Sequence, residues 1–407
     1  MKQFEPLFSL PGDLTDTWRQ KMWQRSELLK PPILKGPGFD YVPLTKYYAK
    51  NYQLPDPTPG LDLASFILPE CTGSYLVYVD GFFRPEMSCI PSSIIALPLA
   101  KAMKSYGLFI QHRLQKTLKE ETDFFALVNG ACHGQSLFLY VPPETKLTTP
   151  LQILHISSSN QTLAMPRTQC VIGKGAHLQI IQTSSQNDSS AVFDCSLDET
   201  ARLSFYDAST PSCSAWQMQT FRALLKKDSF LQAFFLTTGS ETVRNSFAVE
   251  LTDEGSEALI KGLSMLSGKA ESHVYGKIEH KAPHCKSRQQ IKSILSDSAR
   301  SSFEGKIFVH PAAQKTEAYQ HSQSLLLSPS ATTFTKPNLE IFADDVKASH
   351  GATISQPDAE SLFYLRSRGL SLKEARRLLI QGFCQEMLEE IPFASIKNTF
   401  LKALFHG

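Results

Sequence analysis

The sequence predicts a mainly β protein whose central β region is flanked by helical regions at both ends. Short runs in which apolar and polar residues alternate fill the chain from about residue 135 to residue 354, and helical spacing of the apolar residues dominates before and after them. The 407 residues, 42% of them hydrophobic, are enough for a large core and two or three folding units. We therefore expect a mainly helical region over 1–131, a β core over 132–355 and a helical region over 356–407.

The N-terminal region begins with one amphipathic helix. Leu14, Trp18, Met22, Arg25 and Leu29 recur at helical spacing, and two prolines, at 31 and 32, end the run. A connection rich in proline, glycine and aspartate follows, then the strand-like "SYLVYVDGFF", then helical patterning from about Ser92 to Ala131 with a break at Gly107.

The central region has the pattern of many short strands. Val243, Phe247, Val249 and Leu251 alternate with polar or small residues, as expected of a strand with one buried face. Turn sequences such as "VIGKGAH", "LTDEGSEA" and "LSPSATTF" separate such runs, and no helix intervenes. This pattern is typical of a sandwich, a barrel or a parallel β-solenoid, and periodicity does not choose among them.

The C-terminal region predicts two helices. The first begins with the capping-box residues Ser371 and Glu374 and ends before Pro392. The second covers Ile396 to Phe405. The apolar face of the first helix consists of Leu372, Ala375, Leu379, Phe383, Met387 and Ile391.

Composition excludes several partners and locations. Forty-one basic against 39 acidic residues give no basic field for nucleic acid or an acidic membrane surface. No apolar run is long enough to span a membrane, and the first residues lack the pattern of a signal peptide, so we expect a cytoplasmic protein. The eight scattered cysteines form no C-x-x-C pair and suggest reduced, mostly buried thiols.

Motifs for nucleotide chemistry are missing. "GLSMLSGKA" has five residues between Gly262 and Gly268, where a P-loop has four, and it ends in Ala270 instead of Ser or Thr. "GKGAH" at Gly173 lacks the third glycine of a dinucleotide fingerprint. Neither a G-x-S-x-G nor an H-E-x-x-H motif is present, so we expect no enzyme of these classes.

One histidine lies on a strand-like segment among small residues. On an extended chain from 346 to 355, His350 shares a face with Val346, Ala348, Ala352 and Ile354. Two interpretations remain open from the pattern: a core histidine bonded to a backbone carbonyl, or a ligand for a metal or cluster that the small neighbours leave room to approach.

Two other groups are weaker candidates. His280, His284 and Cys285 could bind a metal, but a fourth ligand is lacking nearby and Pro283 indicates a turn. Asp344 and Asp345 could form an acid–base pair, but adjacent residues of a strand face opposite ways, so a solvated turn is the better interpretation.

The segment "KPNLEIFADDVKASHGATISQPDAESLFYLRSRGLSLKEARRLLIQGF", from Lys336 to Phe383, closely resembles the SufB/SufD family of scaffold subunits in SUF iron–sulfur cluster assembly. The similarity continues upstream through "GKIEHKAPHC" and, more weakly, near Phe124. SufB-like chains carry a cysteine where Ser322 stands and His-Glu-Ala-Thr where this chain has "HGAT" at 350–353, so both differences favour the SufD type.

The resemblance implies a right-handed parallel β-helix core and a non-enzymatic function by assembly. A chain of this type pairs with a SufB-like scaffold through the β-helix, and its C-terminal helices receive a SufC-like ATPase. The implied ATPase dock comprises Tyr364, Leu365, Arg366, Ser367, Arg368 and Gly369. The resemblance also implies that no cofactor is permanently bound. It leads us to expect iron or a cluster that is held transiently and shared with SufB, with this chain contributing to iron acquisition and cluster formation at that interface.

His350 is then the candidate ligand at the SufB interface. Many SufD-like chains have Cys-x-His where this one has Ala348 followed by His350, so the thiolates must come from SufB. Two alternatives remain. One is a SufB-like scaffold acting without a heteromeric partner, which Ser322 disfavours. The other is a polysaccharide-acting β-helix enzyme, which requires acidic and aromatic residues recurring along one outer face.

Overall fold

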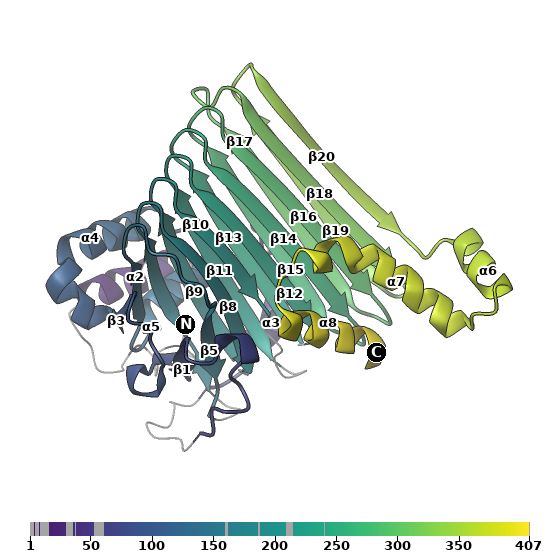
Figure 1. Ribbon diagram of the computed structural model, residues 1–407, viewed down its shortest axis with the longest axis horizontal. Helices are drawn as coiled ribbons and strands as arrows, with labels where there is room; N and C mark the ends of the chain where they lie inside the picture. The colour runs from purple at the N-terminus through teal and green to yellow at the C-terminus, as the bar shows by residue number, and fades with distance from the viewer. Residues whose placement is uncertain are drawn as a thin grey trace.

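The computed structural model describes residues 4, 8, 16–29, 36, 38–52, 61–158, 162–185, 188–208, 215–239 and 241–406. Its centre is a parallel β-solenoid of about seven turns, with helices at the N- and C-terminal ends of the chain (Figure 1). The solenoid confirms the mainly β prediction and, among the three architectures that the pattern allowed, excludes the sandwich and the barrel.

Consecutive long strands alternate between two sheets, which we name sheet A and sheet B. Pairing is parallel except between β1 and β2 and between β3 and β4. The strands of sheet A, in order, are β2 (Phe82–Phe83), β1 (Tyr75–Val79), β5 (Leu151–Ile156), β8 (His177–Ser185), β10 (Arg202–Asp207), β12 (Phe230–Thr238), β14 (Glu257–Leu266), β16 (Lys286–Leu295), β18 (Thr316–Leu326) and β20 (Val346–Ser355). Those of sheet B are β19 (Thr332–Ile341), β17 (Arg300–Val309), β15 (Glu271–His280), β13 (Thr242–Leu251), β11 (Trp216–Leu225), β9 (Asp188–Leu197), β7 (Arg167–Ile172), β4 (Leu137–Val141) and β3 (Ile95–Pro98), and β6 (Leu163–Ala164) pairs with β9.

The turns at one corner are stacked by backbone hydrogen bonds. Thr200 has φ +57° and donates its amide to the carbonyl of Lys227, 2.9 Å away in the next turn. Asp228, at φ +53°, donates in the same way to Glu254 at 3.0 Å. Because each turn needs one left-handed residue, these positions favour glycine, aspartate and other turn formers.

The core between the sheets contains a ladder of phenylalanines contributed alternately by sheet B and sheet A. Their ring centroids lie 4.9 to 6.2 Å apart, within the range of favourable aromatic contact. The five residues are Phe193, Phe205, Phe221, Phe235 and Phe247. The inward positions that the alternating pattern predicted, Val243, Phe247, Val249 and Leu251, are all buried.

The N-terminal region is mixed. Its helices are α2 (Asp16–Leu29), α3 (Leu44–Tyr48), α4 (Leu99–Glu120) and α5 (Phe124–Cys132), with 3-10 turns η2 (Pro69–Cys71) and η3 (Pro85–Met87). Helical structure predicted from Ser92 begins only at Leu99, because β3 precedes it, and the predicted break near Gly107 occurs at Tyr106. Strands β1 and β3 already belong to the two sheets. Leu14 and the prolines at 31 and 32 lie outside the described residues.

The C-terminal helices are α6 (Ala359–Ser367), α7 (Leu372–Glu389) and α8 (Ala394–His406). The capping box of Ser371 and Glu374 is confirmed. Cys384, Met387 and Leu388 of α7 pack with residues of α8 against the outer face of sheet A. The predicted apolar face is wrong at Leu372, which is 42% exposed, because only the second half of α7 joins this cluster.

Candidate functional site at the open end of the solenoid

The solenoid ends in two edge strands. β20 is the last strand of sheet A and β19 the last strand of sheet B, so each has a strand neighbour in its sheet on one side only. β20 forms one border of the molecule, away from α4 (Figure 1). Edge strands present backbone N–H and C=O groups that are available for pairing with another chain. We call this end of the solenoid, β19 with β20, the open end.

His350 lies at the open end on an inward-facing row of side chains. It pairs in register with Gln320 of β18, which pairs with Gln289 of β16. Gln320 Nε2 donates to Gln289 Oε1 at 3.0 Å. The shared face with Val346 and Ala348 is confirmed, since those two pack partly buried on the core. The interpretation of His350 as a packed core histidine is wrong for this chain by itself, because no turn among the described residues covers β20 and the side chain is exposed.

The polar row is not fully satisfied inside the protein. Gln320 Oε1 and Gln289 Nε2 are buried and have no hydrogen-bond partner in the described structure. Ser322 is also buried on the inward face, opposite Ala352 in register. A hydroxyl, and no thiol, therefore occupies this inward position.

On the inward faces of its two strands, the open end offers one strong metal ligand, the imidazole of His350. Ala348 supplies no thiolate, and among the described residues no group of three or more His, Cys, Asp or Glu is placed to hold a metal ion. Iron in clusters usually needs thiolate ligands. His350 can therefore contribute one ligand to a shared site but does not complete one.

Exposed apolar side chains surround the open end, and the sequence analysis did not predict their exposure. Phe334 and Ile341 lie on β19, Phe342 follows that strand, and Ile354 lies on β20; Phe342 is 59% exposed. Tyr41 of the N-terminal region stacks on Phe334 with ring centroids 4.4 Å apart. An apolar group on an exposed sheet edge is typical of a protein interface. Its signal in the sequence was the repeated aromatic and aliphatic residues of 334–342.

The residues of the implied ATPase dock lie on and after α6. Tyr364, Arg366, Ser367, Arg368 and Gly369 are exposed, and Leu365 is half-buried. The Arg368 guanidinium lies 5.2 Å from the Tyr364 ring centroid, and Gly369, at φ +96°, ends the helix. None of the residues of α6 is buried.

Several apolar residues beside this segment are exposed, which the sequence pattern did not predict. Phe363 is 76% exposed, and Leu372 and Leu378 of α7 are also exposed. Together with Tyr364 they form the apolar patch of α6 and α7. The sequence pattern assigned Leu372 to a buried helix face, so it did not predict this exposed patch.

The weaker metal candidates do not form a site. His280 is buried, its Nε2 lies 2.8 Å from Ser287 Oγ, and burial lowers its pKa to about 4. Burial also raises the pKa of the Cys285 thiol. His284 occupies a turn at φ +59°.

Asp344 and Asp345 are exposed in a bend before β20, as the solvated-turn interpretation predicted. They offer no paired carboxylates on a common strand face.

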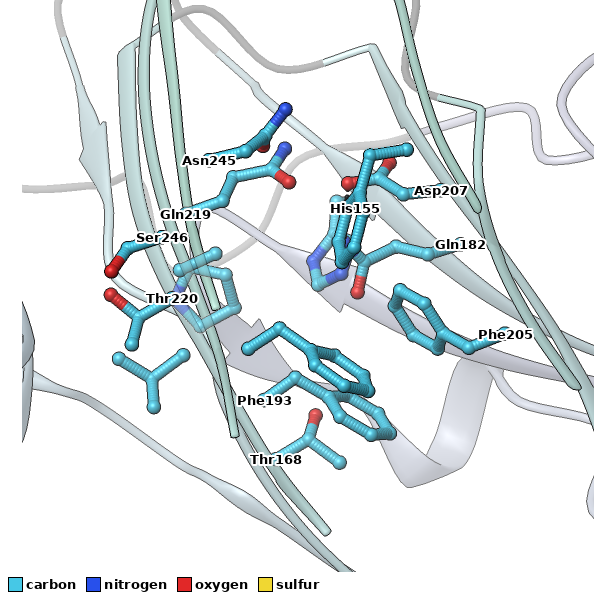
Figure 2. Close-up of a pocket in the computed structure, with 15 residues that line it drawn as sticks. His155, Thr168, Gln182, Phe193, Phe205, Asp207, Gln219, Thr220, Asn245 and Ser246 are labelled. Carbon is cyan, nitrogen blue, oxygen red and sulfur yellow. Dashed lines mark hydrogen bonds between the residues drawn. The ribbon is translucent and has the colours of Figure 1, made fainter. Parts of the chain in front are cut away.

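A small cavity with a mixed polar and aromatic lining lies inside the solenoid, where His155, Gln182 and Asp207 face Gln219 and Asn245 (Figure 2). Its volume of about 20 Å³ is on the scale of a single water molecule. Burial lowers the pKa of the His155 imidazole to about 4, and the neighbouring Gln182 side chain opposes this shift. This cavity is too small for an organic substrate.

No described helix is long and apolar enough to cross a membrane. Residues 155–383 match the domain described as "SUF system FeS cluster assembly, SufBD core domain".

Several curated proteins are similar to the chain. The Synechocystis iron-sulfur cluster assembly SufBD family protein slr0076 is 32% identical over 363 residues, 83% of this chain and 79% of that protein. Protein ABCI7, chloroplastic, of Arabidopsis thaliana is 28% identical over 68% of this chain and 61% of its own. The Escherichia coli iron-sulfur cluster assembly protein SufD is 36% identical over 178 residues, 44% of this chain and 42% of its own. The solenoid and these similarities together show that the chain belongs to the SufBD family of iron–sulfur cluster assembly proteins.

Proposed function

We propose that this chain is a non-catalytic, SufD-type scaffold subunit of a SUF complex. The observation that carries the proposal is the exposed imidazole of His350 on the inward row of an uncapped solenoid. A second solenoid that pairs with β19 and β20 would continue both sheets and enclose this imidazole. The apolar residues around the open end, such as Phe342 and Ile354, would be buried in that interface.

The SufD type is supported by three features. The aligned segment of the Escherichia coli protein named SufD is 36% identical to this chain. Ser322 stands where SufB-like chains carry cysteine, and Gly351 stands where they carry glutamate. A SufB-like partner would then supply the thiolates, and iron or a nascent cluster would be cargo shared across the interface.

The second proposed partner is a SufC-like ATPase, docked on the patch of α6 and α7. Phe363 and Tyr364 give that patch two large exposed rings, and Arg366 and Arg368 surround them with positive charge. Aromatic and arginine side chains are enriched at protein interfaces. ATP hydrolysis would belong to the partner, consistent with the missing P-loop motif.

Co-expression with SufB- and SufC-type partners, followed by anaerobic purification, tests the role of His350. His350→Ala is expected to assemble but to lose bound iron and sulfide. The matched control is His321→Ala, because His321 is an exposed histidine on the neighbouring strand that pairs with Gly351 and faces outward. Unchanged iron and sulfide in His350→Ala, or an equal loss in the control, would contradict the proposed role.

The ATPase dock is tested in the same preparation. Phe363→Asp is expected to release the ATPase while the SufB-type partner stays bound, whereas Gln381→Asp, an exposed position on α7, retains both. A point variant is sharper than truncation at residue 356, because truncation would also uncover the sheet A residues that α7 and α8 bury. A stable cluster on the isolated chain would instead favour a scaffold that acts without a heteromeric partner.

A further inference from the structure

A groove of about 500 Å³ lies between α4 and the outer face of sheet B. Its volume is in the range of small-molecule sites, roughly 300–1,000 Å³. Long polar side chains connect the second half of α4 to the sheet. Arg113 donates to the hydroxyl of Ser196, and Lys116 Nζ lies 3.2 Å from a carboxylate oxygen of Glu250. These bridges leave open space beneath the helix.

Part of the floor of the groove is apolar. Val171 of β7, Leu224 of β11 and Ala248 of β13 point outward from sheet B and are only partly buried. Phe109 of α4 lines the groove from the opposite side and is exposed. A flat hydrocarbon or aromatic group would remove these four side chains from water.

The groove contains the guanidinium group of Arg222 from sheet B, which two carboxylates hold in place. Arg222 Nε donates to Asp194 Oδ1 at 2.6 Å, and its Nη1 pairs with Glu121. Asp194 is shared with Arg167, whose Nη2 lies 2.8 Å from Oδ2. Arg222 Nη2 is buried and has no hydrogen-bond partner among the residues that the structure describes.

Arg113 adds a positive charge that is not paired with a carboxylate. In the described part of the chain it forms no ion pair within 4.0 Å, and its polar partner is the Ser196 hydroxyl. The other carboxylates of the lining, Glu120, Glu250, Asp198 and Glu279, pair with lysines. Around Asp194 and Glu121, by contrast, three guanidinium groups gather, those of Arg113, Arg222 and the buried Arg167 behind them. Burial, followed by the charge of Arg113, lowers the pKa of Arg222 to about 10. Like charges in a partly dry site favour an anion between them.

We propose that this groove binds a small organic anion with an apolar or aromatic body. Its carboxylate or phosphate group would contact Arg113 beside Arg222, and its body would cover Val171 and Leu224 beneath Phe109. Guanidinium groups bind both kinds of anion through charge-assisted hydrogen bonds. The site is separate from the proposed scaffold function, because its strands β7 to β15 precede the open end in sheet B.

Isothermal titration calorimetry on the full chain tests the charge requirement. The probes are 2-naphthoate, 2-naphthyl phosphate and uncharged 2-naphthamide. At least one anionic probe is expected to bind about tenfold more tightly than the amide, a difference of about 1.4 kcal/mol, and the stronger of the two anions identifies the preferred group. Equal binding of all three probes, or no binding at millimolar concentration, would overturn the proposal.

Variants locate the binding. Arg113→Gln is expected to weaken the anionic probes about tenfold and to leave the amide unchanged, whereas Lys119→Gln, exposed on the same helix outside the groove, has no effect. Ala248→Trp fills the floor and is expected to abolish binding of every probe. Circular dichroism verifies that each variant is folded. Wild-type affinity in both Arg113→Gln and Ala248→Trp would place the probes elsewhere and refute the site.

Discussion

Gln320 and His350 are register partners on adjacent strands, yet Gln320 is 2% exposed and His350 is exposed. Both side chains belong to the inward row, so their strand faces are equivalent. The difference arises because β20 covers Gln320 and nothing in the described structure covers β20. The final turn of the solenoid therefore presents core-facing chemistry at the surface.

A thiol added beside His350 is expected to strengthen cluster retention in the proposed complex. Ala348→Cys places a sulfur on the same strand face, about 7 Å along the strand from His350. Iron and sulfide content of the anaerobically purified complex measures the effect. Ser349→Cys, on the opposite face, is the control, and an equal gain in both variants would show that position on the inward row is irrelevant.

Gly276 of β15 leaves space for a ring of the phenylalanine ladder. A Cβ at this position would lie 2.1 Å from Phe247 Cζ. Gly276→Ala is therefore expected to lower the free energy of unfolding by about 1–3 kcal/mol, as overpacking does in close-packed cores. Gly107→Ala is the control, because its Cβ would meet open space in α4. Urea unfolding compares them, and equal stabilities would show that the ring moves aside freely.

Two buried histidines are expected to make the protein less stable in mild acid. Burial lowers the pKa of His155 and His280 from 6.5 to about 4. Between these values the unfolded chain binds protons that the folded chain does not, so the free energy of unfolding falls as pH falls, by about 1.4 kcal/mol per pH unit for each histidine. Unfolding by urea between pH 6.5 and 5 measures this slope.

His155→Gln isolates one of the two contributions and is expected to reduce that slope by about half. Carboxyl groups contribute equally to the slope in the wild-type protein and in the variant. One of them is Asp194, whose pKa is raised by burial. An unchanged slope in His155→Gln would mean that His155 is not the neutral, buried group described here.

The two faces of α7 are expected to respond differently to truncation of their side chains. Met387 is fully buried against sheet A, so Met387→Ala is expected to cost about 2–5 kcal/mol and to speed hydrogen exchange in α7 and α8. Leu378 is exposed, so Leu378→Ala is expected to leave stability within about 0.5 kcal/mol and to weaken ATPase binding. Comparable stability losses would contradict this packing.

Local sequence patterns predicted the order of the regions and the inward face of the strands. Alternation identified Val243, Phe247, Val249 and Leu251 as buried, and the capping box at Ser371 located the start of α7. These features are local, because strand faces follow a period of two and a helix cap needs residues only three positions apart. The motifs from 336 to 383 also indicated the family.

Local patterns did not predict which inward residues are covered, because that depends on how distant segments pack together. Gln320 and His350 carry the same local pattern, and Leu372 shares the helical spacing of Met387, yet one member of each pair is exposed. The groove beneath α4 likewise joins Arg113 to Arg222, residues far apart in the sequence. Burial depends on which segments lie opposite one another in space, and periodicity along a chain records only the direction in which each side chain points.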